Sequence, residues 1–203
     1  MSVVDVLERI AEIRAGLVPP ALAAPPAAAP AQTGASFSAL LQSAGAAPAQ
    51  AAAPALPAGS GGAGVLAAVQ REVGVAEQPP GSNDSPRIAQ YRQATAGSGV
   101  GPWCAYFTSW AAREAGMPLG DNGQGFGSVD ALYAWAQGAG RAVPNGAGVV
   151  PRPGDLIVWD EHIGVVESVL PDGSVQTIEG NSSDQVARRT HPAGSALGYV
   201  RMG

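Results

Sequence analysis

Hydrophobic positions in the middle of the chain recur every three or four residues, which is the spacing of an amphipathic helix. Val65, Leu66 and Val69 begin this pattern, and Gly74 follows it as a stop signal. Ser85 followed by Pro86 has the form of a helix cap with proline in the first turn. Four helices are predicted in this way, at residues 65–73, 86–95, 103 or 104 to 116, and 128–137.

After Pro153 the pattern changes to short runs rich in Val and Ile, separated by turn residues, which is typical of strands. Strands are predicted at residues 155–159, 163–170, 174–179, 186–189 and 197–201. Helices that come first and antiparallel strands that follow define the α+β class. Residues 62–203 are therefore expected to form one α+β domain with a small antiparallel sheet.

The N-terminal region has a different pattern. Residues 1–17 predict a short amphipathic helix with a narrow apolar face, and a helix of this length is marginal in water when alone. The face either docks on a protein partner or on a second copy of the chain, or it belongs to a frayed helix with no target. Residues 18–61 are rich in Ala and Pro and are interpreted as a disordered linker, because they cannot bury enough apolar surface to offset the loss of entropy on ordering.

Charge and hydropathy exclude several classes of protein. The formal net charge of -5 gives no positively charged face for nucleic acid. A membrane-spanning helix needs roughly 18 consecutive apolar residues, and no uninterrupted apolar stretch of the sequence approaches this length. The first 17 residues mix acidic residues with arginine, so they do not have the basic tip and apolar run of a secretory signal peptide. If the substrate lies outside the cytoplasm, we expect another export route.

The chain has a single cysteine, Cys104, which excludes an intramolecular disulfide and makes this residue a candidate nucleophile. It stands where a loop turns into a predicted helix, in the segment GPWCAYFTSWAAREAG. The helix dipole and the free N–H groups of the first turn favour the thiolate form, and the same N–H groups are candidates to hold an oxyanion. The alternative role for a lone cysteine is that of a small buried core residue.

His162 opens a predicted strand and is the candidate base, while Glu179 and Asn181 share one face of the next strand. A two-residue turn at positions 172 and 173 pairs 171 with 174 and brings His162 to the face of both partners, with Asn181 nearer. A three-residue loop that pairs 170 with 174 places His162 on the opposite face. A catalytic group therefore requires the first register or a bulge.

Three further features have alternative interpretations. Trp103, beside the cysteine, either lines a substrate groove or packs in the core. His191 lies in the segment RRTHPAG and is interpreted as a surface histidine, since no acidic partner is near it in sequence. The run GDNGQGFGSVD lacks the spacing of a calcium loop, so we predict a loop and no metal site.

Five segments occur in an order that resembles the CHAP family of amidases and endopeptidases, within the larger NlpC-like papain superfamily. They are EQPPGSNDSPRIAQYRQ, PWCAYFTSWAAREAG, GDLIVWDEHIGVVESV, IEGN and GYVR. The resemblance implies a papain-like α+β fold, peptidoglycan as the substrate and no required cofactor. It also implies that Cys104 is the nucleophile, His162 the base and Glu179 the group that orients the base, with Asn181 as an additional polar member.

We therefore expect a peptidoglycan hydrolase, either an N-acetylmuramoyl-L-alanine amidase or an endopeptidase, that works through a thioester. A catalytically idle CHAP-type adaptor is the alternative, and amide synthesis or transglutamination on the same site is another. The expected location is the cell wall or periplasm. The short helix, the Ala/Pro linker and the hydrolase resemble proteins of bacterial flagellar assembly, whose export apparatus bypasses signal peptides, and a phage lysin is the other setting.

Overall fold

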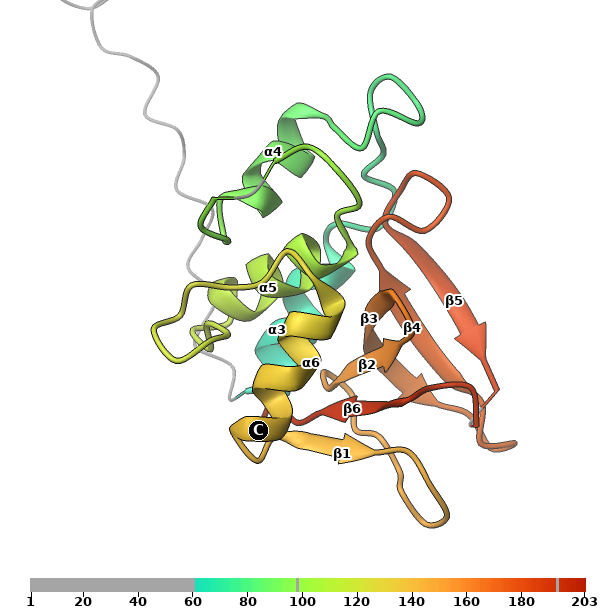
Figure 1. Cartoon of the computed structure of the whole chain (residues 1–203). Helices are drawn as coiled ribbons and strands as arrows, with labels where there is room; N and C mark the ends of the chain where they lie inside the picture. The colour runs from blue at the N-terminus through green and yellow to red at the C-terminus, as the bar shows by residue number, and fades with distance from the viewer. Residues whose placement is uncertain (1–60, 98, 193) are drawn as a thin grey trace, which may run out of the picture. The chain divides into compact units, whose positions relative to one another are not determined.

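The computed structural model of the protein describes residues 61–97, 99–192 and 194–203. The helix predicted at residues 1–17 and the linker predicted at 18–61 lie outside the described residues, apart from Gly61. Within the described ranges the helices precede an antiparallel sheet along the chain, as the hydrophobic pattern predicted (Figure 1). The α+β class is therefore confirmed.

Serine caps begin two of the helices. The Ser85 hydroxyl accepts a hydrogen bond from the backbone N–H of Ile88 at 3.2 Å, and Ser128 accepts one from Ala131 at 3.3 Å. The second helix ends earlier than predicted, and beyond its end the Thr95 hydroxyl donates to the carbonyl of Arg92 at 2.9 Å. The helices are α3 (Gly62–Gln70), α4 (Pro86–Arg92), α5 (Cys104–Glu114) and α6 (Val129–Gly138).

The strands form one six-stranded antiparallel sheet in the order β1-β6-β2-β3-β4-β5. Five of them match the predicted strands within two residues at each end, and the short edge strand β1, which ends in proline, was not predicted. The strands are β1 (Ala142–Pro144), β2 (Leu156–Trp159), β3 (His162–Val169), β4 (Val175–Glu179), β5 (Ala187–His191) and β6 (Gly198–Val200).

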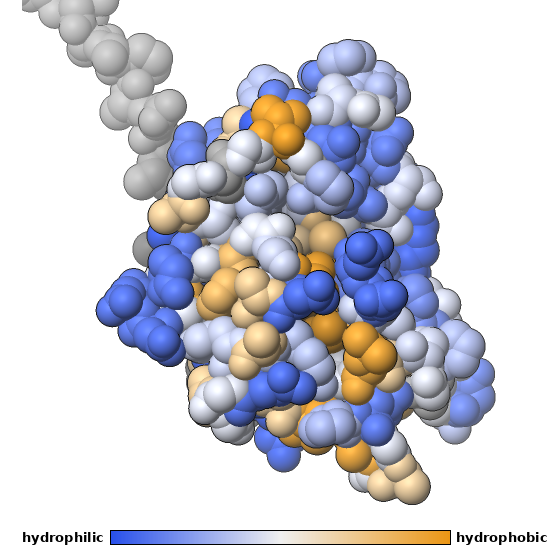
Figure 2. All heavy atoms as spheres, in the orientation of Figure 1, coloured by the Kyte–Doolittle hydropathy of each residue, from blue (hydrophilic) through white to orange (hydrophobic). Residues whose placement is uncertain are grey.

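Alternation along the strands divides the buried residues between the two faces of the sheet. Val158, Ile163 and Ile178 belong to the main core, which also contains the buried side chains of the helices, and both α3 and α5 contact β3. A smaller cluster on the other face includes Ile157 and Tyr199. On the outside of the molecule, hydrophobic residues form small patches among hydrophilic ones on the face shown in Figure 2.

The turn between β3 and β4 has the three-residue form, so the two-residue turn, one of the two routes that the sequence left open for the catalytic group, is wrong. The N–H of Leu170 donates to the carbonyl of Ser174 at 2.8 Å, and Gly173 takes a positive φ of 84°. A bulge between Val166 and Ser168 then shifts the register by one residue, so that Val165 pairs with Ile178. The bulge returns His162 to the face of Glu179, which the turn alone would not do.

Membrane crossing is not a property of these helices. In the ranges that the structure describes, no helix combines the length and the apolar character that a bilayer span requires.

Candidate active site

Cys104 is the first residue of α5, as the sequence predicted, and only 4% of it is exposed. No side chain caps this helix start, so the N–H groups of the first turn stay available to an anion. The sulfur lies 4.0 Å from the carbonyl oxygen of Glu161. It borders a groove of about 340 Å³, which is lined by Pro102, Cys104, Gly127, Ser128, Val129, Asp130 and Glu161.

Trp103 holds the start of α5 from inside the core. It is fully buried, and its indole N–H donates to the Glu77 carboxylate at 2.9 Å. Its ring centroid lies 5.9 Å from that of Tyr91 and 6.2 Å from that of Phe107. Of the two roles considered for Trp103, the structure favours packing over contact with a substrate in the groove.

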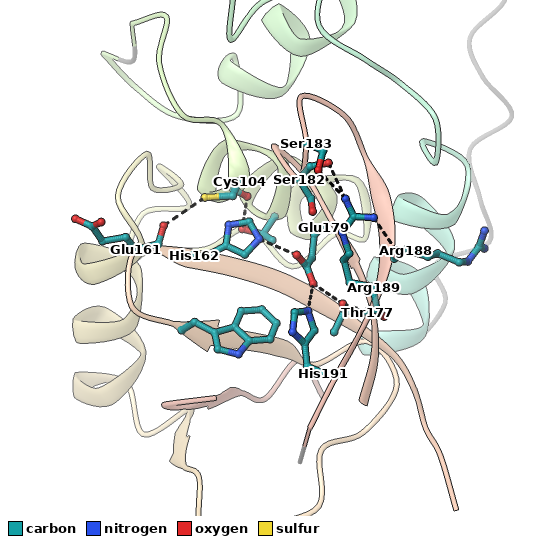
Figure 3. Close-up of polar contacts among 12 residues, drawn as sticks. Cys104, Glu161, His162, Thr177, Glu179, Ser182, Ser183, Arg188, Arg189 and His191 are labelled. Atoms are coloured by element: carbon teal, nitrogen blue, oxygen red, sulfur yellow. Dashed lines mark hydrogen bonds and ion pairs between the residues drawn. The ribbon is translucent and has the colours of Figure 1, made fainter. Parts of the chain in front are cut away.

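His162 begins β3 directly after the two-residue turn formed by residues 160 and 161, which places it beside the start of α5 (Figure 3). Its Nε2 is 2.8 Å from Oε2 of Glu179. Nδ1 is therefore the ring nitrogen that remains for exchanging a proton with Cys104. The structure thus brings together three of the predicted site residues: Cys104, His162 and Glu179.

The pKa of His162 reflects opposing effects. Burial lowers it, but the hydrogen bonds and charges of Cys104 and Glu179 raise it more, to about 9. For Glu179, burial raises the pKa of the carboxyl, and hydrogen bonds from His162, Thr177 and His191 outweigh this effect and lower it. Near neutral pH the pair is therefore an imidazolium held against a carboxylate.

Glycine makes room for this carboxylate and for the helix beside it. A Cβ on Gly164 would lie 2.6 Å from Cγ of Glu179, so a side chain at that position would displace the glutamate. A Cβ on Gly180 would lie 2.7 Å from Cβ of Phe107, because the end of β4 approaches α5 closely there. Gly164 therefore leaves room for the glutamate side chain, and Gly180 lets the end of β4 meet the nucleophile-bearing helix.

Asn181 lies two residues beyond the end of β4 and adopts a positive φ of 57°. The chain has left the strand at this point, so the side-chain alternation used in the sequence argument no longer applies. The imidazole Nε2 bonds to Glu179, the residue that the family resemblance ranked first. A catalytic role for Asn181 stays a prediction.

His191 was interpreted wrongly as a surface histidine without a partner. Strand β5 extends to this residue, and His191 Nε2 lies 2.6 Å from Oε1 of Glu179, the same carboxylate that His162 uses (Figure 3). Its side chain is 28% exposed. The partner lies 12 residues away across an antiparallel pair, so proximity in sequence gave no signal; a longer β5 would have revealed it.

Metal ligation has no candidate group in the described part of the chain, where no three or more His, Cys, Asp or Glu side chains are arranged to hold an ion. Asp121, from the loop GDNGQGFGSVD, accepts a hydrogen bond from the indole N–H of Trp135 at 2.9 Å. This contact gives the aspartate a structural partner.

A cysteine at a helix start, beside a histidine that a buried carboxylate holds, is the arrangement by which cysteine peptidases and amidases form a thioester. Residues 95–181 match the family model of the CHAP domain. The match confirms the resemblance described from the sequence. CHAP domains are in general peptidoglycan hydrolases of the amidase or peptidase type, which act on the cell wall outside the cytoplasm. No curated protein and no solved structure matches the chain.

Proposed function

We propose that this protein hydrolyses amide bonds of peptidoglycan, with Cys104 as nucleophile, His162 as acid and base, and Glu179 as the residue that orients His162. The contact between His162 Nε2 and Glu179 Oε2 at 2.8 Å carries the proposal, because it leaves Nδ1 for Cys104 at the mouth of the groove. The CHAP match supplies the substrate class. A papain-like relation of helix and sheet belongs to the same proposal.

In the first step the Cys104 thiolate attacks the amide carbonyl carbon, and the developing oxyanion accepts hydrogen bonds from the first-turn N–H groups of α5. The C–N bond then breaks while the His162 imidazolium donates its Nδ1 proton to the departing amine. The products of this step are a free amine, a neutral imidazole and a thioester on Cys104. The raised pKa of His162 suits this step, since the acid is present at neutral pH.

In the second step water attacks the thioester carbon and His162 takes the proton from the water. Part of the rise in the His162 pKa comes from Cys104, and that part is lost while the sulfur is acylated. The imidazole of the acyl-enzyme therefore binds a proton less tightly, so a larger fraction of it is neutral and able to act as the base. The C–S bond breaks and the cell-wall fragment leaves as a carboxylic acid, which releases its remaining proton to the solvent. His162 keeps the proton taken from the attacking water, so the thiolate–imidazolium pair is restored.

Digestion of purified sacculi tests the proposal. Wild-type protein should lower the turbidity of the suspension, and Cys104→Ala should leave it unchanged. Mass spectrometry of the released fragments distinguishes the two bonds, since an amidase frees the muramic acid lactyl group and an endopeptidase leaves a shortened stem or cross-bridge.

The same digestion separates the alternatives. If wild type and Cys104→Ala leave sacculi equally intact, the protein is an idle adaptor and the proposal fails. An added primary amine that appears in the products in place of water indicates amide synthesis or transglutamination. We place the activity in the cell wall or periplasm, with flagellar assembly as the proposed setting and peptidoglycan as the partner.

A further inference from the structure

The Glu179 carboxylate has two histidine partners, and the mechanism above uses only one. Glu179 is 2% exposed, and its two oxygens have separate partners. Oε2 faces His162 Nε2 at 2.8 Å, while Oε1 faces His191 Nε2 at 2.6 Å. The hydroxyl of Thr177 also donates to Oε1, at 2.5 Å. An ionised carboxylate only accepts hydrogen bonds, so each of these partners must present a proton to it.

The sheet fixes the place of His191. It is the last residue of β5 and pairs with Val175, so it shares a sheet face with Thr177 and Glu179 on β4. Its ring centroid lies 4.4 Å from that of Trp159. The His162 ring stacks on the same indole, with centroids 5.8 Å apart.

A carboxylate held through one oxygen can rotate about its last side-chain bond. The orientation of His162 would then vary with it, and misplacement of a catalytic group by about 1 Å can cost roughly 100-fold in rate. Donors on Oε1 remove this freedom and leave Oε2 directed at His162. The Trp159 indole restrains both rings from the side.

We propose that His191 is a positioning residue, which locks the Glu179 carboxylate so that His162 is oriented toward Cys104. This inference rests on the proposed function for the roles of His162 and Cys104. His191 itself does not touch the reacting atoms, and it acts through the hydrogen bond from its Nε2 to Oε1.

Alkylation of Cys104 by iodoacetamide at neutral pH tests the inference without peptidoglycan. His191→Phe removes the N–H and keeps a ring against Trp159, whereas His191→Gln replaces Nε2–H by an amide N–H at a similar reach. The alkylation rate should fall roughly 10- to 100-fold in His191→Phe, by analogy with the loss of a hydrogen-bond partner that orients a metal-ligating histidine. It should return to within about threefold of wild type in His191→Gln.

Proton NMR of the histidine rings supplies a second readout. The chain has only two histidines, so His162 is the only histidine that gives ring signals in the His191 variants. Wild type and His191→Gln should show a downfield Nε2–H signal for His162, protected by Glu179. In His191→Phe this signal should broaden through exchange with water.

Thr190→Val is the matched control, because Thr190 is exposed on the same strand and points to the other face. It should leave both readouts as in wild type. Wild-type behaviour of folded His191→Phe would overturn the inference, as would equal damage in His191→Gln and His191→Phe. If wild type fails to digest sacculi while alkylation and ring signals still fall in His191→Phe and return in His191→Gln, the proposed function is refuted and the positioning role stands.

Discussion

Gly164 lies directly beneath the side chain of Glu179, and the space of its missing Cβ is the space that the glutamate Cγ needs, 2.6 Å away. The nearest backbone atom, the carbonyl oxygen of Ile178, is 3.4 Å from the same point. The glutamate side chain therefore limits the size of this residue more than the backbone does.

Gly164→Ala should push the Glu179 carboxylate away from His162 and reduce sacculus digestion on the order of 10². Gly146→Ala is the control, since a Cβ there meets no atom within 4 Å. Initial rates of turbidity loss measure the effect, with circular dichroism to verify folding. Equal activity of the two variants would show that Glu179 relaxes without loss of function.

Glu179→Gln and Asn181→Ala separate the two candidates for orienting His162. A carboxylate stabilises the imidazolium directly, so Glu179→Gln should lower the pKa of His162 from about 9 and cost on the order of 10² to 10⁴ in rate. Asn181→Ala should reduce the rate less. NMR titration of the His162 ring measures the pKa, and digestion of sacculi measures the rate. Glu167→Gln breaks an ion pair with Arg188 on the same sheet and is the control. A larger loss in Asn181→Ala would reverse the assignment.

The stability of the fold should depend on pH through His162. Its pKa is about 9 in the folded protein and 6.5 when unperturbed, so its protonation stabilises the folded state fully below about pH 6.5. This contribution is lost as the pH rises from 6.5 through 9. Urea unfolding of wild type and His162→Ala should show a difference in free energy that shrinks over this range. A constant difference would mean that the ring does not change protonation there.

Trp103→Phe tests the packing role of Trp103. The change leaves the buried Glu77 carboxylate, 4% exposed, without the indole N–H that it accepts at 2.9 Å. We expect the free energy of unfolding to fall by about 1–3 kcal/mol. Trp135→Phe removes an exposed indole bond to Asp121 and should cost less than about 1 kcal/mol. A change in digestion pattern with unaltered stability would instead support a role for Trp103 in the substrate groove.

Much of the fold could be predicted from local signals in the sequence. The cap at Ser85, the helix start at Cys104 and the strand that begins near His162 follow from residue types within a few positions of each other. The pairing of strands was harder, because the turn at Gly173 and the bulge at Glu167 each change the register and their effects cancel for the site. His162 thus reaches the face of Glu179 through the bulge, which the sequence had left open as the alternative to a two-residue turn.

The second histidine shows where sequence reasoning ends. Cys104 and His162 stand next to recognisable element boundaries, whereas the partner of His191 is set by the pairing of β4 with β5. That pairing extends the last predicted strand to His191 and turns its ring onto the Glu179 face. The residues near His191 in the sequence do not predict its contact with Glu179.

Because of the bulge between Val166 and Ser168, the face on which His162 lies depends on the number of residues in the hairpin. With the present number of residues between the turn and His162, the imidazole lies on the same sheet face as the Glu179 carboxylate. One residue more or less would move the imidazole to the opposite face. Tolerance to length changes here therefore follows parity: pairs of residues can be added or removed while the base keeps its side. A single-residue deletion at Glu167 would present the histidine to the helix layer, however well the shortened hairpin still folds.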